Sequence, residues 1–156
     1  MNQQPVLYVE DEENDVFFMR SAWKKAGLLN LLNVVMDGEQ ALEYLSGQGA
    51  FANREQYPLP ALVLLDLKLP KISGLDVLKW IRQQPAIHTL PVIVLSSSNK
   101  LQDVCTAYEF RANAYLVKPA HMQNLFEMVA SLKDFWLGRV ETPPECLELR
   151  AATQVE

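Results

Sequence analysis

The chain has 156 residues, of which 49% are hydrophobic and 21% charged, a composition typical of one globular domain. Its net charge of −5 disfavours nonspecific nucleic-acid binding, which requires a basic surface. No apolar run approaches the roughly 20 residues of a membrane span, and no signal peptide is evident. We therefore expect a cytoplasmic protein that contacts neither membrane nor nucleic acid directly.

Apolar stretches and helical patterns alternate along the chain. Five short apolar stretches are predicted as strands: residues 6–9, 33–36, 62–65, 92–95 and 114–117. Five segments with helical periodicity or helix-terminal residues are predicted as helices: residues 15–26, 39–45, 73–83, 101–110 and 122–137. This alternation predicts an α/β fold, a doubly wound parallel sheet of five strands with helices on both faces.

Cap and turn residues refine these boundaries. Asn14 is expected to cap the first helix and Gly27 to end it. Residues 47–60 form a polar loop that is longer than most helix-to-strand connections. Residues 138–156, which include Cys146, are expected to be a C-terminal tail or arm, with no separate output domain.

Polar residues follow four of the predicted strands. Glu10 and Asp11 come directly after the first strand, Asp66 after the third, Ser96 after the fourth and Lys118 after the fifth. In open α/β sheets, ligands bind at the carboxyl ends of the strands. The set of carboxylates, a hydroxyl and an ammonium therefore suits a divalent cation and a phosphoryl group.

Each of these residues has a chemical role in such a site. Carboxylate oxygens from Glu10, Asp11 and Asp66 are ligands that Mg²⁺ prefers. Asp66 is the candidate nucleophile, because carboxylates form aspartyl phosphates. Lys118 supplies a positive charge for a phosphoryl oxygen and Ser96 a hydrogen bond. Taken singly, the acids could be ordinary helix-start or turn residues, and Lys118 a surface lysine; their joint occurrence favours the site.

This ordered set resembles the receiver domain of two-component response regulators, over residues from about 5 to 137. The resemblance implies a receiver domain at 1–137 and a flavodoxin-like sheet with strand order 2-1-3-4-5. It is carried by these motifs: Glu10-Asp11, Asp66, Leu69-Pro70, Ser73-Gly74, Ser96, Tyr115 and Lys118-Pro119.

The resemblance also implies a role for each matching residue. Asp66 would accept a phosphoryl group from a sensor histidine kinase, and Lys118 would pair with the phosphate. Glu10, Asp11, Asp66 and the backbone carbonyl of Lys68 would hold Mg²⁺.

Two further residues would form the switch that the resemblance implies. Ser96 would move toward the phosphoryl group and Tyr115 would turn inward, shifting the population between two packings. The face formed by the fourth helix, fifth strand and fifth helix would then change its affinity for partners.

A narrower resemblance is to the stand-alone regulators paired with bacterial phytochrome kinases. It is carried by the long loop before Leu59-Pro60 and by the segments 65–70 and 94–98. Several of those regulators dimerise through the switching face, so the resemblance implies a phytochrome-type kinase partner and a homodimer.

The sequence departs from the common receiver pattern at three positions. Glu10 replaces the more usual aspartate, Lys68 places an amine two residues after Asp66, and Ser97 is bulkier than the small residue often found after the residue at position 96.

Two other functions remain open. An aspartyl-phosphate hydrolase of small phosphoesters would typically carry a second aspartate at the Lys68 position. An interaction protein with a receiver fold and no phosphorylation would not need Asp66 and Lys118 intact.

Overall fold

The computed structural model describes residues 4–143 and contains one five-stranded parallel sheet with the order β2-β1-β3-β4-β5. The predicted strand order is therefore confirmed. The strands are β1 (Val6–Val9), β2 (Leu32–Val35), β3 (Leu62–Leu65), β4 (Val92–Ser96) and β5 (Ala114–Val117). The helices are α1 (Glu13–Lys25), α2 (Gly38–Ser46), α3 (Gly74–Gln83), α4 (Leu101–Glu109) and α5 (Met122–Asp134), with a short 3₁₀ helix, η1 (Gly49–Phe51).

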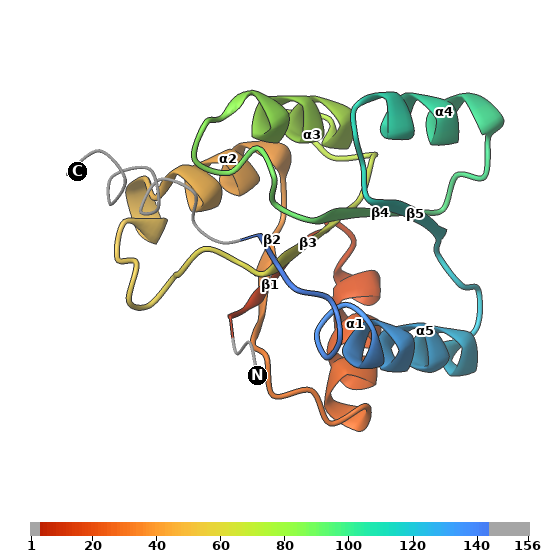
Figure 1. Cartoon of the computed structure of the whole chain (residues 1–156). Helices are drawn as coiled ribbons and strands as arrows, with labels where there is room; N and C mark the ends of the chain where they lie inside the picture. Colours follow the sequence, from red (N-terminus) through yellow and green to blue (C-terminus); the bar gives the residue numbers. More distant parts are fainter. Residues whose placement is uncertain (1–3, 144–156) are drawn as a thin grey trace.

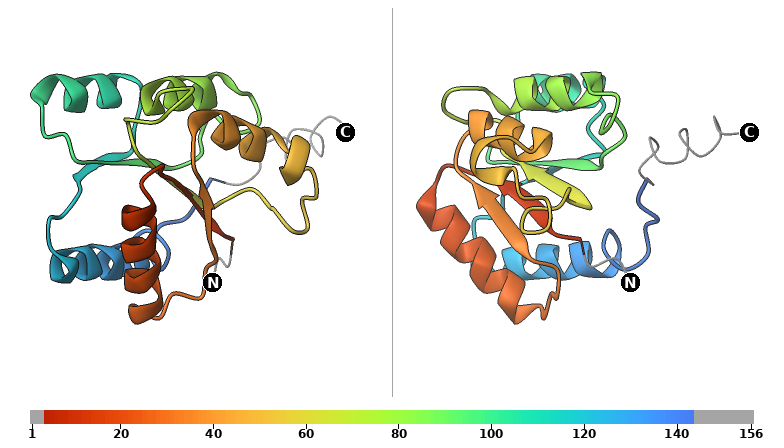
Figure 2. Two further views of the ribbon diagram at one scale, coloured as in Figure 1. Left: turned by 180° about the vertical axis from the view of Figure 1, so that it is seen from behind. Right: turned by 90° about the vertical axis from the view of Figure 1, so that its left-hand side faces the viewer.

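The sheet lies between two helical layers (Figure 1), which are visible again from behind and from the side in Figure 2. Helices α1 and α5 cover one face, and α2, α3 and α4 cover the other. Successive residues of a strand point to opposite faces. In β1, Val6 and Tyr8 pack in the core with α1 and α5, whereas Leu7 and Val9 pack in the core with α2 and α3. Burial on both faces explains why these strands are almost continuously apolar.

The strand register aligns the polar residues that follow the strands. Val9 pairs with both Val35 and Leu65, so β1, β2 and β3 end at the same level. The Asp66 amide donates to the Val9 carbonyl at 3.1 Å. The Lys118 amide donates to the Ser96 carbonyl at 2.8 Å, which brings the end of β5 to the same edge. One edge of the sheet therefore collects the side chains that the sequence singled out.

Two predicted helix ends differ from the structure by two residues or more, and the other ends agree to within one residue. Helix α1 begins at Glu13 with Glu12 at the cap position, so the prediction that Asn14 is the cap was wrong. The reason is that acidic side chains in the first turn also favour a helix N-terminus, and α1 begins in a run of them. Helix α5 ends at Asp134 rather than residue 137, because the Leu137 amide donates to the Leu132 carbonyl, five residues back, at 3.1 Å. Gly27 follows α1 with a φ of 71°, in agreement with its predicted role.

The C-terminal tail is described only in part. Within residues 138–143, the Val140 amide donates to the Phe135 carbonyl at 2.9 Å and keeps this segment against the end of α5. The predicted tail from residue 144 onward, including Cys146, lies outside the described residues. Of the helices in residues 4–143, none is long and apolar enough to cross a membrane.

Gly74, the first residue of α3, lies against the backbone of the β3–α3 loop. A Cβ atom at this position would lie 2.0 Å from the Asp66 carbonyl oxygen and 2.7 Å from the Leu67 Cα. We expect Gly74→Ala to lower the free energy of unfolding by about 2 kcal/mol, because backbone atoms must shift to accept the methyl group. Urea unfolding measures this change. Lys79→Ala, at an exposed position of α3, is the control and is expected to stay within about 0.5 kcal/mol of wild type; equal stability of both variants would contradict the close approach.

Candidate functional site

Three carboxylates meet at the carboxyl edge of the sheet. Glu10 and Asp11 follow β1 and Asp66 follows β3, and one carboxylate oxygen from each lies within 4.8 Å of the others. Glu10 is fully buried and Asp66 is 5% exposed, while Asp11 is half-buried. The structure thus brings together the three acidic side chains for which the resemblance implied metal binding.

Lys118, directly after β5, points its amine into this acidic group. The amine donates to Glu10, to Asp66 Oδ2 at 2.9 Å and to Asp15 Oδ2 at 2.9 Å. Burial disfavours the charged amine, but the hydrogen bonds to the three carboxylates outweigh burial and raise the pKa of Lys118. Lys118 is therefore a permanent positive charge beside Asp66.

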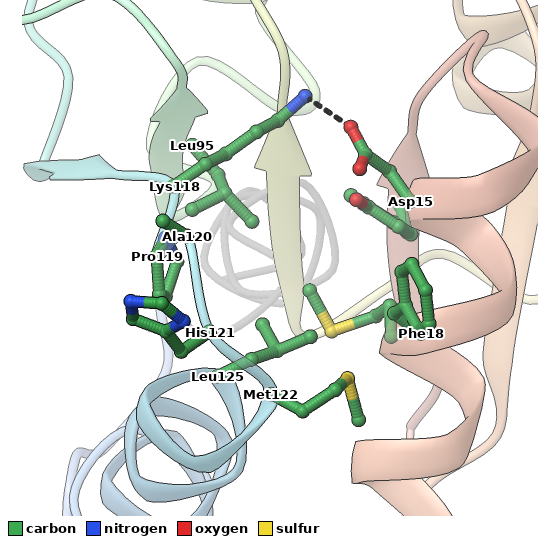
Figure 3. Close-up of a pocket in the computed structure, with 11 residues that line it drawn as sticks. Asp15, Phe18, Leu95, Lys118, Pro119, Ala120, His121, Met122 and Leu125 are labelled. Atoms are coloured by element: carbon green, nitrogen blue, oxygen red, sulfur yellow. Dashed lines mark hydrogen bonds and ion pairs between the residues drawn. The ribbon is translucent and has the colours of Figure 1, made fainter.

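Asp15 is a site residue that sequence reasoning missed. It lies in the first turn of α1, across from Lys118, and the two side chains point toward each other (Figure 3). Burial works against its charged form, yet hydrogen bonding with Glu10 and Lys118 and the Lys118 charge hold the pKa of Asp15 below its usual value. No local signal distinguished it, because an acid in the first turn of a helix is already favoured by the helix dipole.

Glu10 shows that the site suits a cation. Its Oε2 is buried and has no hydrogen-bond partner among the described residues. Burial, followed by hydrogen bonding with Asp66, raises the pKa of Glu10 to about 9. A buried, unsatisfied carboxylate oxygen beside two further carboxylates fits a hard divalent cation, which takes oxygen ligands. The residues present therefore fit a divalent metal.

Lys68 contributes to the site through its backbone, and its side chain is exposed. Its amide donates to Asp66 Oδ1 at 3.3 Å, which helps to fix the carboxylate orientation. Metal binding by its carbonyl stays a prediction from the resemblance.

Ser96 and Tyr115 both form a hydrogen bond with Ser98, a residue of the β4–α4 loop. Ser96 is 1% exposed, and its hydroxyl accepts a hydrogen bond from the Ser98 amide at 3.2 Å. The Tyr115 hydroxyl donates to the Ser98 carbonyl at 2.8 Å. A movement of this loop would therefore affect both side chains, although the sequence predicted no role for Ser98 itself.

We expect Glu10→Gln to raise the free energy of unfolding of the metal-free protein by about 1 kcal/mol at neutral pH, because an amide is neutral without the cost of protonating a carboxyl whose pKa is raised to about 9 in the folded state. The same variant should lose most of the stabilisation that Mg²⁺ gives the wild type. Urea unfolding in EDTA and in millimolar Mg²⁺ measures both effects. Glu13→Gln, at an exposed position of α1, is the control and should keep the Mg²⁺ response; an unchanged Mg²⁺ response in Glu10→Gln would contradict its place in the metal site.

Comparison with known proteins decides the family. The profile of the response regulator receiver domain matches residues 6–130. The chain belongs to the response regulator receiver family. This receiver is 38% identical to the response regulator Rcp1 of Synechocystis sp. over 138 residues, which cover 88% of this chain and 92% of Rcp1.

Two solved receiver structures are close to this one. The Mn²⁺-bound form of Rcp1 has a TM-score of 0.81 and 37% identity, covering 90% of this chain and 99% of that chain. The phosphorylated cyanobacterial phytochrome response regulator RcpA has a TM-score of 0.84 and 33% identity, covering 92% of this chain and all of that chain (100%). The predicted resemblance to phytochrome response regulators is confirmed.

Proposed function

We propose that this receiver accepts a phosphoryl group on Asp66 from a sensor histidine kinase, in a Mg²⁺-dependent reaction, and then changes its affinity for a partner. One observation carries the proposal: the nearly buried Asp66 carboxylate lies 2.9 Å from the Lys118 amine, with carboxylate oxygens of Glu10 and Asp11 within 4.8 Å. A carboxylate nucleophile, a fixed ammonium and a cation site are the parts that phosphoryl transfer requires.

The phosphoryl transfer requires only the phosphodonor and a proton from solvent. An Asp66 carboxylate oxygen forms a bond to the phosphorus atom of the donor, and the bond from phosphorus to the donor's leaving atom breaks. The leaving atom, an imidazole nitrogen of the kinase, keeps the electron pair and takes a proton from solvent. Lys118 neutralises charge on a phosphoryl oxygen. Glu10, Asp11, Asp66 and the Lys68 carbonyl would hold Mg²⁺, which neutralises phosphoryl charge when bound.

The relatives and the exposed apolar residues support the choice of partners. Since phytochrome response regulators are among the similar structures, we propose a phytochrome-type histidine kinase as the phosphoryl donor. We also propose a homodimer through the face of α4, β5 and α5, where large apolar side chains are exposed: Leu101, Tyr108 and Val117. Ser96 and Tyr115 would couple the phosphoryl group to this face. Cytoplasmic location and the absence of direct nucleic-acid contact stay predictions.

The two other functions are less well supported. A hydrolase of small phosphoesters typically needs a second acid two residues after the nucleophile, and that position holds Lys68 with an exposed side chain. A receiver fold without phosphorylation would leave the buried Glu10, Asp66 and Lys118 group without a use. We therefore propose a signalling protein rather than an enzyme that turns over an external substrate.

Acetyl phosphate tests the proposal directly. With Mg²⁺ and acetyl phosphate, intact-mass measurement should show the addition of one phosphoryl group, and EDTA should prevent it. Multiple turnover of p-nitrophenyl phosphate would instead favour the hydrolase. No adduct from acetyl phosphate or from a phytochrome-type kinase would favour the interaction protein.

A further inference from the structure

The Lys118 amine is shared by carboxylates from three different elements. Glu10 follows β1, Asp66 follows β3 and Asp15 lies in α1. Glu10 and Asp66 belong to the group of carboxylates whose oxygens converge for a metal ion, whereas Asp15 does not. A cation at that group therefore competes with Lys118 for Glu10 and Asp66 but leaves Asp15 available.

Apart from these carboxylates, the described surroundings of the Lys118 amine are largely apolar. Its side chain is 16% exposed. Together with Asp15, it lines a pocket of about 140 Å³ between α1 and α5 whose other walls are largely apolar, including Phe18, Leu95 and Leu125 (Figure 3). An amine that loses its carboxylate partners in this position would remain partly buried and unpaired, which is costly.

We propose that Asp15 is the positioning residue of Lys118. When a divalent cation takes the oxygens of Glu10 and Asp66, Asp15 retains the amine, keeps it paired and holds it beside the phosphoacceptor. Metal binding then does not leave Lys118 without a partner, so Asp15 strengthens cation binding without being a ligand. This inference rests on the proposed metal-dependent function and adds a residue to it.

The substitution Asp15→Asn is therefore expected to weaken cation binding about fivefold. Residues that support metal ligands from outside typically change metal affinity by about ten- to a hundredfold. We expect an effect somewhat below this range, because the Asp15 side chain is 40% exposed and solvent screens part of its charge.

The test is a Mn²⁺ titration of the full chain, with free Mn²⁺ followed by electron paramagnetic resonance. Glu13→Gln removes the same charge from the same helical turn at an exposed position and serves as the matched control. It should weaken binding less than twofold. Asp15→Glu, which retains a carboxylate, should recover much of the wild-type affinity. Urea unfolding of each variant establishes that it is folded at the titration conditions.

A double-mutant cycle separates positioning from a general effect of charge. If Asp15 acts through Lys118, Asp15→Asn in a Lys118→Met background should weaken Mn²⁺ binding no more than Glu13→Gln does. A fivefold loss that persists without Lys118 would overturn the inference, as would Asp15→Asn binding Mn²⁺ like wild type. If the wild-type chain binds no Mn²⁺, the proposed metal-dependent function fails together with this inference. If the wild-type chain binds Mn²⁺ and Asp15→Asn binds it with the same affinity, the inference alone fails.

Discussion

Asp66→Asn is expected to abolish the phosphoryl adduct that the wild-type chain forms with acetyl phosphate and Mg²⁺. The amide is nearly the same size as the carboxylate, and its oxygen can still accept one of the two hydrogen bonds that Asp66 accepts, from Lys118 or from the Lys68 amide. It lacks the anionic oxygen that attacks phosphorus, so the chemical step and not the fold is lost. Intact-mass measurement after incubation should show the unmodified chain alone.

Stability measurements make this result specific to the chemistry. Asp66→Asn should unfold at an equal or higher urea concentration than wild type in EDTA, because one of the carboxylates around Lys118 is neutralised. Asp76→Asn, at an exposed position of α3, is the matched control and should give the full adduct. An adduct of wild-type yield on Asp66→Asn would place the phosphoacceptor elsewhere and contradict the proposed function.

The sequence predicted the sheet and its acidic edge because both depend on local patterns. Apolar stretches that end in polar residues identify the strands, and parallel strands necessarily present those ends at one edge. The sequence does not predict which charged residues at this edge contact Lys118, because Lys118 lies 108 residues from Glu10 in the chain. No local pattern states which carboxylates a distant lysine contacts.

Asp15 and Asn14 show where local reasoning fails. An acid in the first turn of a helix is already explained by the helix dipole, so Asp15 carried no sign of its contact with Lys118. Asn14 is a good cap residue, but α1 begins one residue before it in a run of acids that also favour a helix start. In both cases several residues satisfy the same local preference, and only tertiary contacts decide between them.

Lys118→Met is expected to lower the free energy of unfolding by about 3 kcal/mol in EDTA, because it leaves Glu10, Asp15 and Asp66 close together without their cation. Methionine keeps most of the side-chain length, so packing against the pocket is largely retained. Urea unfolding in EDTA measures the loss. Lys79→Met, at an exposed position of α3, is the control and should stay within about 0.5 kcal/mol of wild type.

Mg²⁺ distinguishes the charge of Lys118 from its bulk. A divalent cation bound by Glu10, Asp11 and Asp66 neutralises the same carboxylates, so millimolar Mg²⁺ should recover much of the stability that Lys118→Met loses. A loss of equal size in EDTA and in Mg²⁺ would mean that Lys118 stabilises the fold by packing. A loss that shrinks in Mg²⁺ means that the lysine and the metal neutralise one shared acidic group, and that the resting receiver uses Lys118 in place of the cation.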